Sequence, residues 1–234
     1  MPTPIQIATE LAIPDGPLLA ILAHPDDELL FAGKAAATKY ARQRVRFASL
    51  TMGEAGLAGP ETNSRALGHI RSAELRYASR ILGADPPVIF DFPDGSLTPD
   101  HTRKYADALS EVVDHEQPAR MLRLPPNGLT LHPDHIEASR AALIAFNEAA
   151  PPGCELWEPV ATSGWRELDL DEFMYSGELE VPGHDELVVS WTVGEPFLEQ
   201  KMDAYRAHAS QGESLRHLHP VAGIEAYRLV ARKS

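Results

Sequence analysis

The sequence predicts an α/β fold, with a mostly parallel sheet covered by helices on both faces, in a single domain over residues 1–234. Three observations support this. Short apolar segments alternate with helical patterns over roughly the first 150 residues, as is typical of parallel sheets. A chain of 234 residues that is 44% hydrophobic can bury one sizeable core. No repeat or low-complexity tract divides the chain.

The first expected element is a strand over residues 18–23, because this apolar run shows no alternation. Apolar residues at helical spacing then predict a helix over residues 28–42. Gly83 should end a second helix over residues 62–82, and Thr98 with Pro99 should begin a third that runs to about residue 116. The other expected strands are residues 45–50, 87–92, 119–124, 156–161, 187–193 and 226–231, and the other expected helices are residues 133–149 and 196–209. Residues 162–185 have too little periodicity to be placed.

Composition excludes several classes of protein. The formal net charge of -13 argues against a nucleic-acid-binding surface. No apolar run is long enough for a membrane span, and the first residues do not have the pattern of a secretory signal. The single Cys154 excludes an intrachain disulfide and suits a reducing compartment, so we expect a cytoplasmic protein.

The first expected strand ends in a cluster of a histidine and three acids, His24-Pro25-Asp26-Asp27-Glu28. Open α/β sheets place their sites beyond the carboxyl ends of strands. Carboxylates at this position would repel phosphate and attract a cation. The spacing lets His24 and Asp27 converge on one point, while Asp26 faces the reactants as a separate base. We expect Glu28 to complement the helix dipole or to support a ligand.

A second cluster, His132-Pro133-Asp134-His135, also follows a strand and begins a helix. If the two clusters meet, His24, Asp27 and His135 supply two nitrogens and one oxygen to one divalent ion, with water in an open position. This ligand set suits catalytic zinc.

The residues beside these ligands have separate roles in the prediction. Asp26 would remove a proton from the attacking water. His132 would stabilise the oxyanion or protonate the leaving amine. Asp134 would orient His132, with helix capping as an equally weighted role.

These two clusters strongly resemble the LmbE/PIG-L family of zinc-dependent N-acetylglucosamine deacetylases. The resemblance continues through further blocks, in family order: Thr51-x-Gly53-Glu54-x-Gly56, Arg71-x-x-Glu74, Leu82-Gly83, Phe92-Pro93-Asp94-Gly95 and Lys201-x-x-Ala204-x-x-x-His208-x-Ser210-Gln211.

The resemblance implies a Rossmann-like, LmbE-like fold and one Zn2+ per chain, held by His24, Asp27 and His135. It also implies that Asp26 is the general base and that His132 is the electrostatic or acid partner. Arg71 and Asp94 match positions that hold the sugar. Against that role, Arg71 could form an ordinary helical ion pair with Glu74, and Asp94 could be a turn residue.

The predicted function is removal of the N-acetyl group from an N-acetylglucosamine derivative by metal-activated water. The alternatives are a zinc amidase that cleaves a larger acyl group from a sugar conjugate, a metal-dependent phosphoesterase, and a non-enzymatic metal-binding protein. The expected partner is a small acetylated amino sugar. The aglycone and the oligomeric state stay open, although family members are often multimers, so a homo-oligomer is one option.

Overall fold

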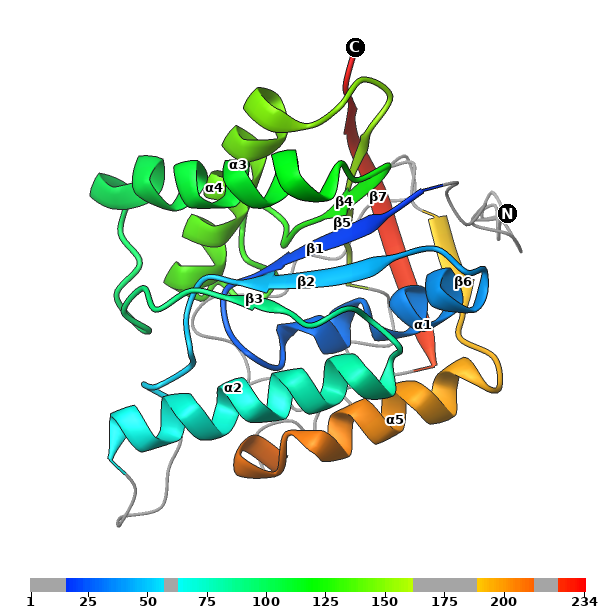
Figure 1. The fold of residues 1–234 in the computed structure, drawn as a ribbon, viewed down its shortest axis with the longest axis horizontal. Helices are drawn as coiled ribbons and strands as arrows, with labels where there is room; N and C mark the ends of the chain where they lie inside the picture. The colour runs from blue at the N-terminus through cyan, green and yellow to red at the C-terminus, as the bar shows by residue number, and fades with distance from the viewer. Residues whose placement is uncertain (1–15, 57–62, 162–188, 213–222) are drawn as a thin grey trace, which may run out of the picture.

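The computed structural model describes residues 16–56, 63–161, 189–212 and 223–234 (Figure 1). Within these residues one sheet of seven strands runs through the molecule, in the order β3-β2-β1-β4-β5-β7-β6. The strands are β1 (Leu18–Leu22), β2 (Val45–Ser49), β3 (Val88–Ile89), β4 (Arg120–Leu122), β5 (Glu155–Pro159), β6 (Val189–Thr192) and β7 (Ile224–Arg232). The first five strands are parallel, whereas β7 is antiparallel to both β5 and β6. This mostly parallel sheet confirms the predicted fold class.

Helices cover both faces of the sheet. Figure 1 shows α3 and α4 packed together on one side, and α1, α2 and α5 on the other. The helices are α1 (Ala32–Tyr40), α2 (Ser64–Ile81), α3 (Thr102–Glu116), α4 (Pro133–Ala149) and α5 (Phe197–Ala207). Because both faces of β1 are covered, every residue of that strand is buried, which explains why its sequence shows no alternation.

The order of the strands determines where a site can form. The chain passes from β1 to β2 and β3 on one side, and then returns to the other side of β1 to form β4. The direction of winding therefore reverses between β1 and β4, and such a switch point leaves a crevice at the carboxyl ends of the two strands. His24 follows β1, and His132 follows β4 through the loop of residues 123–131. The two predicted clusters therefore lie beside each other.

Three expected elements differ from the structure. The helix expected from Glu28 begins later: a 3-10 turn, η1 (Asp27–Leu30), precedes α1. The strand expected over residues 87–92 has only two residues in the ladder, although Phe90 and Phe92 still donate their N–H groups to β2 and to the residue after it. A 3-10 turn, η2 (Pro99–His101), precedes α3, and the Thr98 side chain makes no capping bond to it.

Other boundaries follow the expected signals. The Asn63 side chain caps α2 by accepting the N–H of Ala66, and Gly83 follows the helix with a φ of +71°. Residues 162–185, which the sequence did not place, lie outside the described residues. Among the helices that the structure describes, none combines the length and the apolar character that a bilayer span requires.

Candidate metal centre

The two clusters meet at the start of α4, as the strand order requires. Nδ1 of His24 lies 3.2 Å from Nε2 of His135, and that nitrogen lies 3.2 Å from Oδ1 of Asp27. Nδ1 of His24 is 3.8 Å from the other oxygen of Asp27. All three residues are buried, and one donor atom from each lies within 4.8 Å of the others. The structure thus brings together the three predicted ligands.

The remaining ring nitrogens of the two histidines indicate where their lone pairs point. Nδ1 of His135 lies 2.9 Å from the carbonyl oxygen of Gly128, which can only accept a hydrogen bond. Nε2 of His24 lies 3.0 Å from Oδ1 of Asp94 and 3.3 Å from Oδ2 of Asp134. In each neutral ring the nitrogen facing the other histidine therefore carries a lone pair. Two lone pairs and a carboxylate around one point fit a cation.

Without a cation, a proton on the His24 ring supplies the positive charge at the site. Burial disfavours the charged ring of His24, but the hydrogen bonds to Asp134 and Asp94 outweigh it and raise the pKa of His24 to about 10. Burial likewise disfavours the ionised Asp27, but the positive charge of His135 outweighs it and holds the pKa of Asp27 far below its usual range. Oδ2 of Asp27 also accepts the N–H groups of Ala23 and His24, at 2.9 Å and 2.8 Å. Asp27 is therefore a fixed anion.

Asp26 lies beside these ligands in an unusual backbone conformation. Its φ is 106° and its ψ is -21°, which is uncommon for a residue other than glycine. Oδ2 of Asp26 lies 3.0 Å from Nη2 of Arg71. Burial raises the pKa of the Asp26 carboxyl, and the charge of Arg71 partly opposes this rise. The left-handed turn thus directs Asp27 and Asp26 to different partners.

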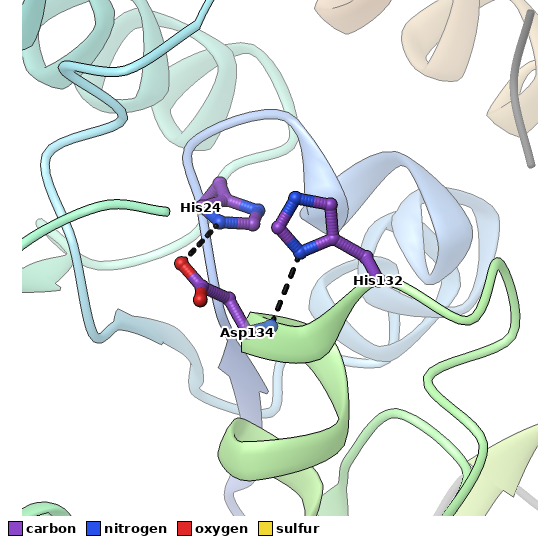
Figure 2. Close-up of side chains that lie close together, drawn as sticks. All are labelled: His24, His132 and Asp134. Atoms are coloured by element: carbon purple, nitrogen blue, oxygen red, sulfur yellow. Dashed lines mark hydrogen bonds and ion pairs between the residues drawn. The ribbon is translucent and has the colours of Figure 1, made fainter. Parts of the chain in front are cut away.

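His132 is the N-cap of α4 (Figure 2), where its Nδ1 accepts the N–H of Asp134 at 3.1 Å. Figure 2 shows its other ring nitrogen directed away from the start of the helix. Burial and the positive charges of His24 and His135 lower the pKa of His132 to about 4, so the ring is neutral at pH 7. Since Nδ1 accepts, the proton of the neutral ring is on Nε2.

Asp134 has partners other than the one that the sequence suggested. Its carboxylate oxygens accept the N–H groups of Gly95 and Leu97, at 2.7 Å and 3.0 Å, and Oδ2 faces Nε2 of His24. Only its backbone N–H reaches His132 in the bonds described above. Asp134 therefore fastens the loop that carries Asp94 and orients His24.

Arg71 and Asp94 also contact the centre rather than open solvent. Nη1 of Arg71 donates to the carbonyl of Gly53 and Nη2 to that of Pro25, each at 2.7 Å. A side chain at Gly53 would collide with the guanidinium, because a Cβ there would lie 2.6 Å from its Cζ. Burial would raise the pKa of Asp94, but its hydrogen bond with His24 outweighs this and lowers it to about 2.

Glu28, which was expected to complement the helix dipole or to support a ligand, pairs with His208, to which the sequence assigned no role in the site. Glu28 and His208 are both fully buried, and Oε1 of Glu28 lies 2.5 Å from Nε2 of His208. Glu74 does not pair with Arg71 as a helical ion pair; its carboxylate accepts the N–H and Oγ–H of Ser210. The last block that resembles the family, which contains His208 and Ser210, was the available signal, but it does not indicate which residue either of them contacts.

Comparisons with known proteins show the family to which the chain is similar. Residues 19–146 match the family profile described as PIG-L, GlcNAc-PI de-N-acetylase. A 1D-myo-inositol 2-acetamido-2-deoxy-alpha-D-glucopyranoside deacetylase of Streptomyces avermitilis is 32% identical to this chain, and the alignment covers 86% of this chain and 84% of the relative.

Two solved structures share the fold. One is the N,N'-diacetylchitobiose deacetylase from Pyrococcus horikoshii, with a TM-score of 0.69 and 17% identity over 92% of this chain and 83% of that protein. The other is the 4-carboxy-2-hydroxymuconate hydratase from Pseudomonas putida, with a TM-score of 0.70 and 16% identity over 94% of this chain and 98% of that protein. The fold thus carries more than one chemistry, and the assignment of a reaction depends on the site and the closer relatives.

Proposed function

This chain belongs to the PIG-L family of GlcNAc-PI de-N-acetylases, and from that premise we propose its function. The chain is a deacetylase that hydrolyses the N-acetyl amide of an N-acetylglucosamine derivative and releases acetate and a free amine. The observation that carries the proposal is the meeting of His24, Asp27 and His135 at one point, with Asp26 and His132 beside it.

We assign one divalent cation to the three ligands His24, Asp27 and His135, with Zn2+ as the expected metal. Two imidazole nitrogens and one carboxylate oxygen are a common set for catalytic zinc. When bound, such a cation polarises a carbonyl and lowers the pKa of water to about 7. The carboxylates of Asp94 and Asp134 hold the His24 ring in the orientation that directs Nδ1 toward this point.

Asp26 is the general base in this proposal. Asp27 faces His135 and Glu28 faces His208, which leaves Asp26 as the third acid of the first cluster, and Arg71 fixes one of its oxygens. Burial raises the pKa of the Asp26 carboxyl. A general base works best when its pKa lies near the pH of the reaction, so this carboxylate is a better base than a solvated one. The attacking water would give its proton to the other oxygen.

His132 is the electrostatic partner. A neutral ring with its proton on Nε2 can donate a hydrogen bond to the oxygen of the amide as negative charge develops there. The helix N–H that occupies Nδ1 keeps the ring in this tautomer and orientation. Asp134 orients both histidines: its backbone N–H bonds Nδ1 of His132, and its carboxylate bonds the His24 ring.

Arg71 and Asp94 are the proposed sugar-binding residues. Both side chains are 5% exposed, and their present bonds go to Asp26 and His24. A sugar that contacts either residue would therefore contact a group that already positions the base or a ligand.

The test is an acetate-release assay over a panel of N-acetylglucosamine conjugates, with and without a chelator. The panel should include 1D-myo-inositol 2-acetamido-2-deoxy-alpha-D-glucopyranoside, the compound in the name of the Streptomyces relative. We expect acetate and a free amine, lost with chelator and restored by added Zn2+. Faster release of longer acids would favour the amidase alternative. Turnover only of phosphate esters, or none of any compound, would contradict the proposal.

The small-molecule partner that we propose is therefore an acetylated amino sugar. A cytoplasmic location is also proposed, because the single cysteine, Cys154, is free and buried.

A further inference from the structure

The backbone of Asp26 needs support that its own sequence does not supply. A φ of 106° is strained for a residue with a side chain, and such conformations persist only where the surroundings hold them. This turn decides that Asp27 faces His135 while Asp26 faces Arg71. A relaxed backbone at this residue would move the proposed base away from its place beside the ligands.

The support comes from Glu28. Its Oε2 accepts the N–H of Asp26 at 2.9 Å, across two residues of the same turn. The side chain of Glu28 is fully buried, so no solvent fixes its rotamer. Its second oxygen, Oε1, lies 2.5 Å from Nε2 of His208. Because a carboxylate accepts, Nε2–H of His208 is the donor of this bond.

His208 comes from the far end of the chain, directly after α5. Its segment is anchored on both sides by bonds that do not involve Asp26. Lys201 of α5 pairs with Glu225 of β7 at 2.8 Å, and Ser210 donates to Glu74 of α2. Nδ1 of His208 has no hydrogen-bond partner among the described residues. Within the described part of the chain, the hydrogen bond that this ring makes is therefore the one from Nε2–H to Glu28.

We propose that His208 is a positioning residue for the general base, acting through Glu28 on the backbone N–H of Asp26. This inference rests on the proposed function for the role of Asp26, and it assigns a use to the last of the sequence blocks. The bond fixes Glu28 in one rotamer, Glu28 fixes the left-handed turn, and the turn places the Asp26 carboxylate. Asp26 and Glu28 lie 2 positions apart and Glu28 and His208 lie 180 apart, yet the three residues form one chain of hydrogen bonds.

Three variants separate this role from ordinary packing. His208→Gln keeps an N–H donor at nearly the distance of Nε2, whereas His208→Asn carries the same group too short to reach Glu28. Ser210→Ala is the matched control, because it removes the hydroxyl bond to Glu74 of α2, keeps the backbone N–H bond to the same carboxylate and leaves His208 in place. The measurements are kcat and KM for acetate release, metal content, thermal stability, and hydrogen exchange of the Asp26 amide.

We expect His208→Asn to lower kcat by about 10- to 100-fold at nearly unchanged KM and metal content, since a misplaced catalytic group costs rate rather than binding. His208→Gln should retain most of the activity. The Asp26 amide should exchange about tenfold faster or more in His208→Asn, because it loses its fixed acceptor. Ser210→Ala should lower the melting temperature while kcat and the Asp26 amide stay as in the wild type.

Several results would overturn the inference. These are a His208→Asn enzyme with wild-type kcat, a His208→Gln enzyme as impaired as His208→Asn, or loss of metal together with activity, which would place the effect on Asp27. If the wild type releases no acetate, the proposed function fails first, and the exchange rate of the Asp26 amide still tests the link to His208 without any turnover.

Discussion

Arg71 holds the side chain of Asp26, whereas Glu28 holds its backbone N–H. Its Nη2 lies 3.0 Å from Oδ2 of Asp26 and 2.7 Å from the carbonyl oxygen of Pro25, so one nitrogen contacts both the base and the corner that carries it. Nη1 of the same guanidinium bonds the carbonyl of Gly53. A buried arginine that joins three acceptors is a device for position more than for charge.

The first prediction concerns this guanidinium. Arg71→Lys keeps the charge but cannot reach three acceptors with one planar group. We expect kcat to fall by about 10- to 100-fold, as for a misplaced catalytic group, with metal content unchanged. The unfolding free energy should fall by about 1–3 kcal/mol, because a buried carbonyl loses its donor. Steady-state kinetics and denaturant unfolding measure these effects. A rise in KM alone would instead make Arg71 purely a sugar-binding residue.

His132 should show separable effects on activity and stability. His132→Ala removes the Nε2–H donor, which should cost about 10²–10³ in kcat. It also removes the N-cap of α4, which should cost about 0.5–2 kcal/mol of stability. His132→Asn restores a good cap, but its amide is too short to place an N–H at the position of Nε2, so stability should recover while kcat does not. Recovery of both would mean that His132 acts only as a cap.

The affinity for metal should depend on pH through His24. Without a cation, hydrogen bonds to Asp134 and Asp94 outweigh burial and raise the pKa of His24 to about 10, so the ring is protonated at pH 7. A cation must displace that proton, and its affinity should rise about tenfold per pH unit from pH 6 to pH 8. Calorimetry of Zn2+ binding in buffers of different ionisation enthalpy counts the released proton. Binding that is independent of pH would contradict the ligand role of His24.

A prediction about acid stability concerns Glu155, the first residue of β5, at the end of the parallel strands away from the site. Burial would raise the pKa of Glu155, but hydrogen bonds from Trp157, Arg232 and Arg120 outweigh it and lower the pKa to about 2. Since the folded pKa lies below the unfolded value of 4.5, the stabilisation is present above pH 4.5 and is lost as the pH falls toward 2. The stability difference between wild type and Glu155→Gln should therefore shrink from pH 6 to pH 3 in urea unfolding. A difference that is constant with pH would argue against this ion cluster.

Local sequence predicted the strand ends well. The run of buried apolar residues in β1, the proline after His24 and Pro133 at the first position of α4 are all local signals, and the fold class they indicated is confirmed. The N-cap of α4 is His132, whereas the sequence offered Asp134 for that role. The meeting of the two clusters was a further step, because it depends on the order of β1 and β4 in the sheet. No residue within either cluster encodes that order.

Long-range partners could not be predicted. Arg71 and Glu74 are three residues apart on α2, a spacing that suggests an ion pair, but their side chains reach the Pro25 corner and Ser210 respectively. Similarly, the helix expected from Glu28 begins later because Asp26 is left-handed and Asp27 turns back toward Ala23. Tertiary contacts outweigh local propensity at both places, and both belong to the site.

The most direct test of the account is the metal content of two variants beside the wild type. Asp26→Asn removes the proposed base, and His135→Ala removes a proposed ligand. After purification and equilibration with Zn2+, we expect one ion per chain in the wild type and in Asp26→Asn, and nearly none in His135→Ala. Asp26→Asn should also lose about 10²–10⁴ in kcat. Equal metal loss in both variants, or full metal in His135→Ala, would contradict the assignment of ligands and base.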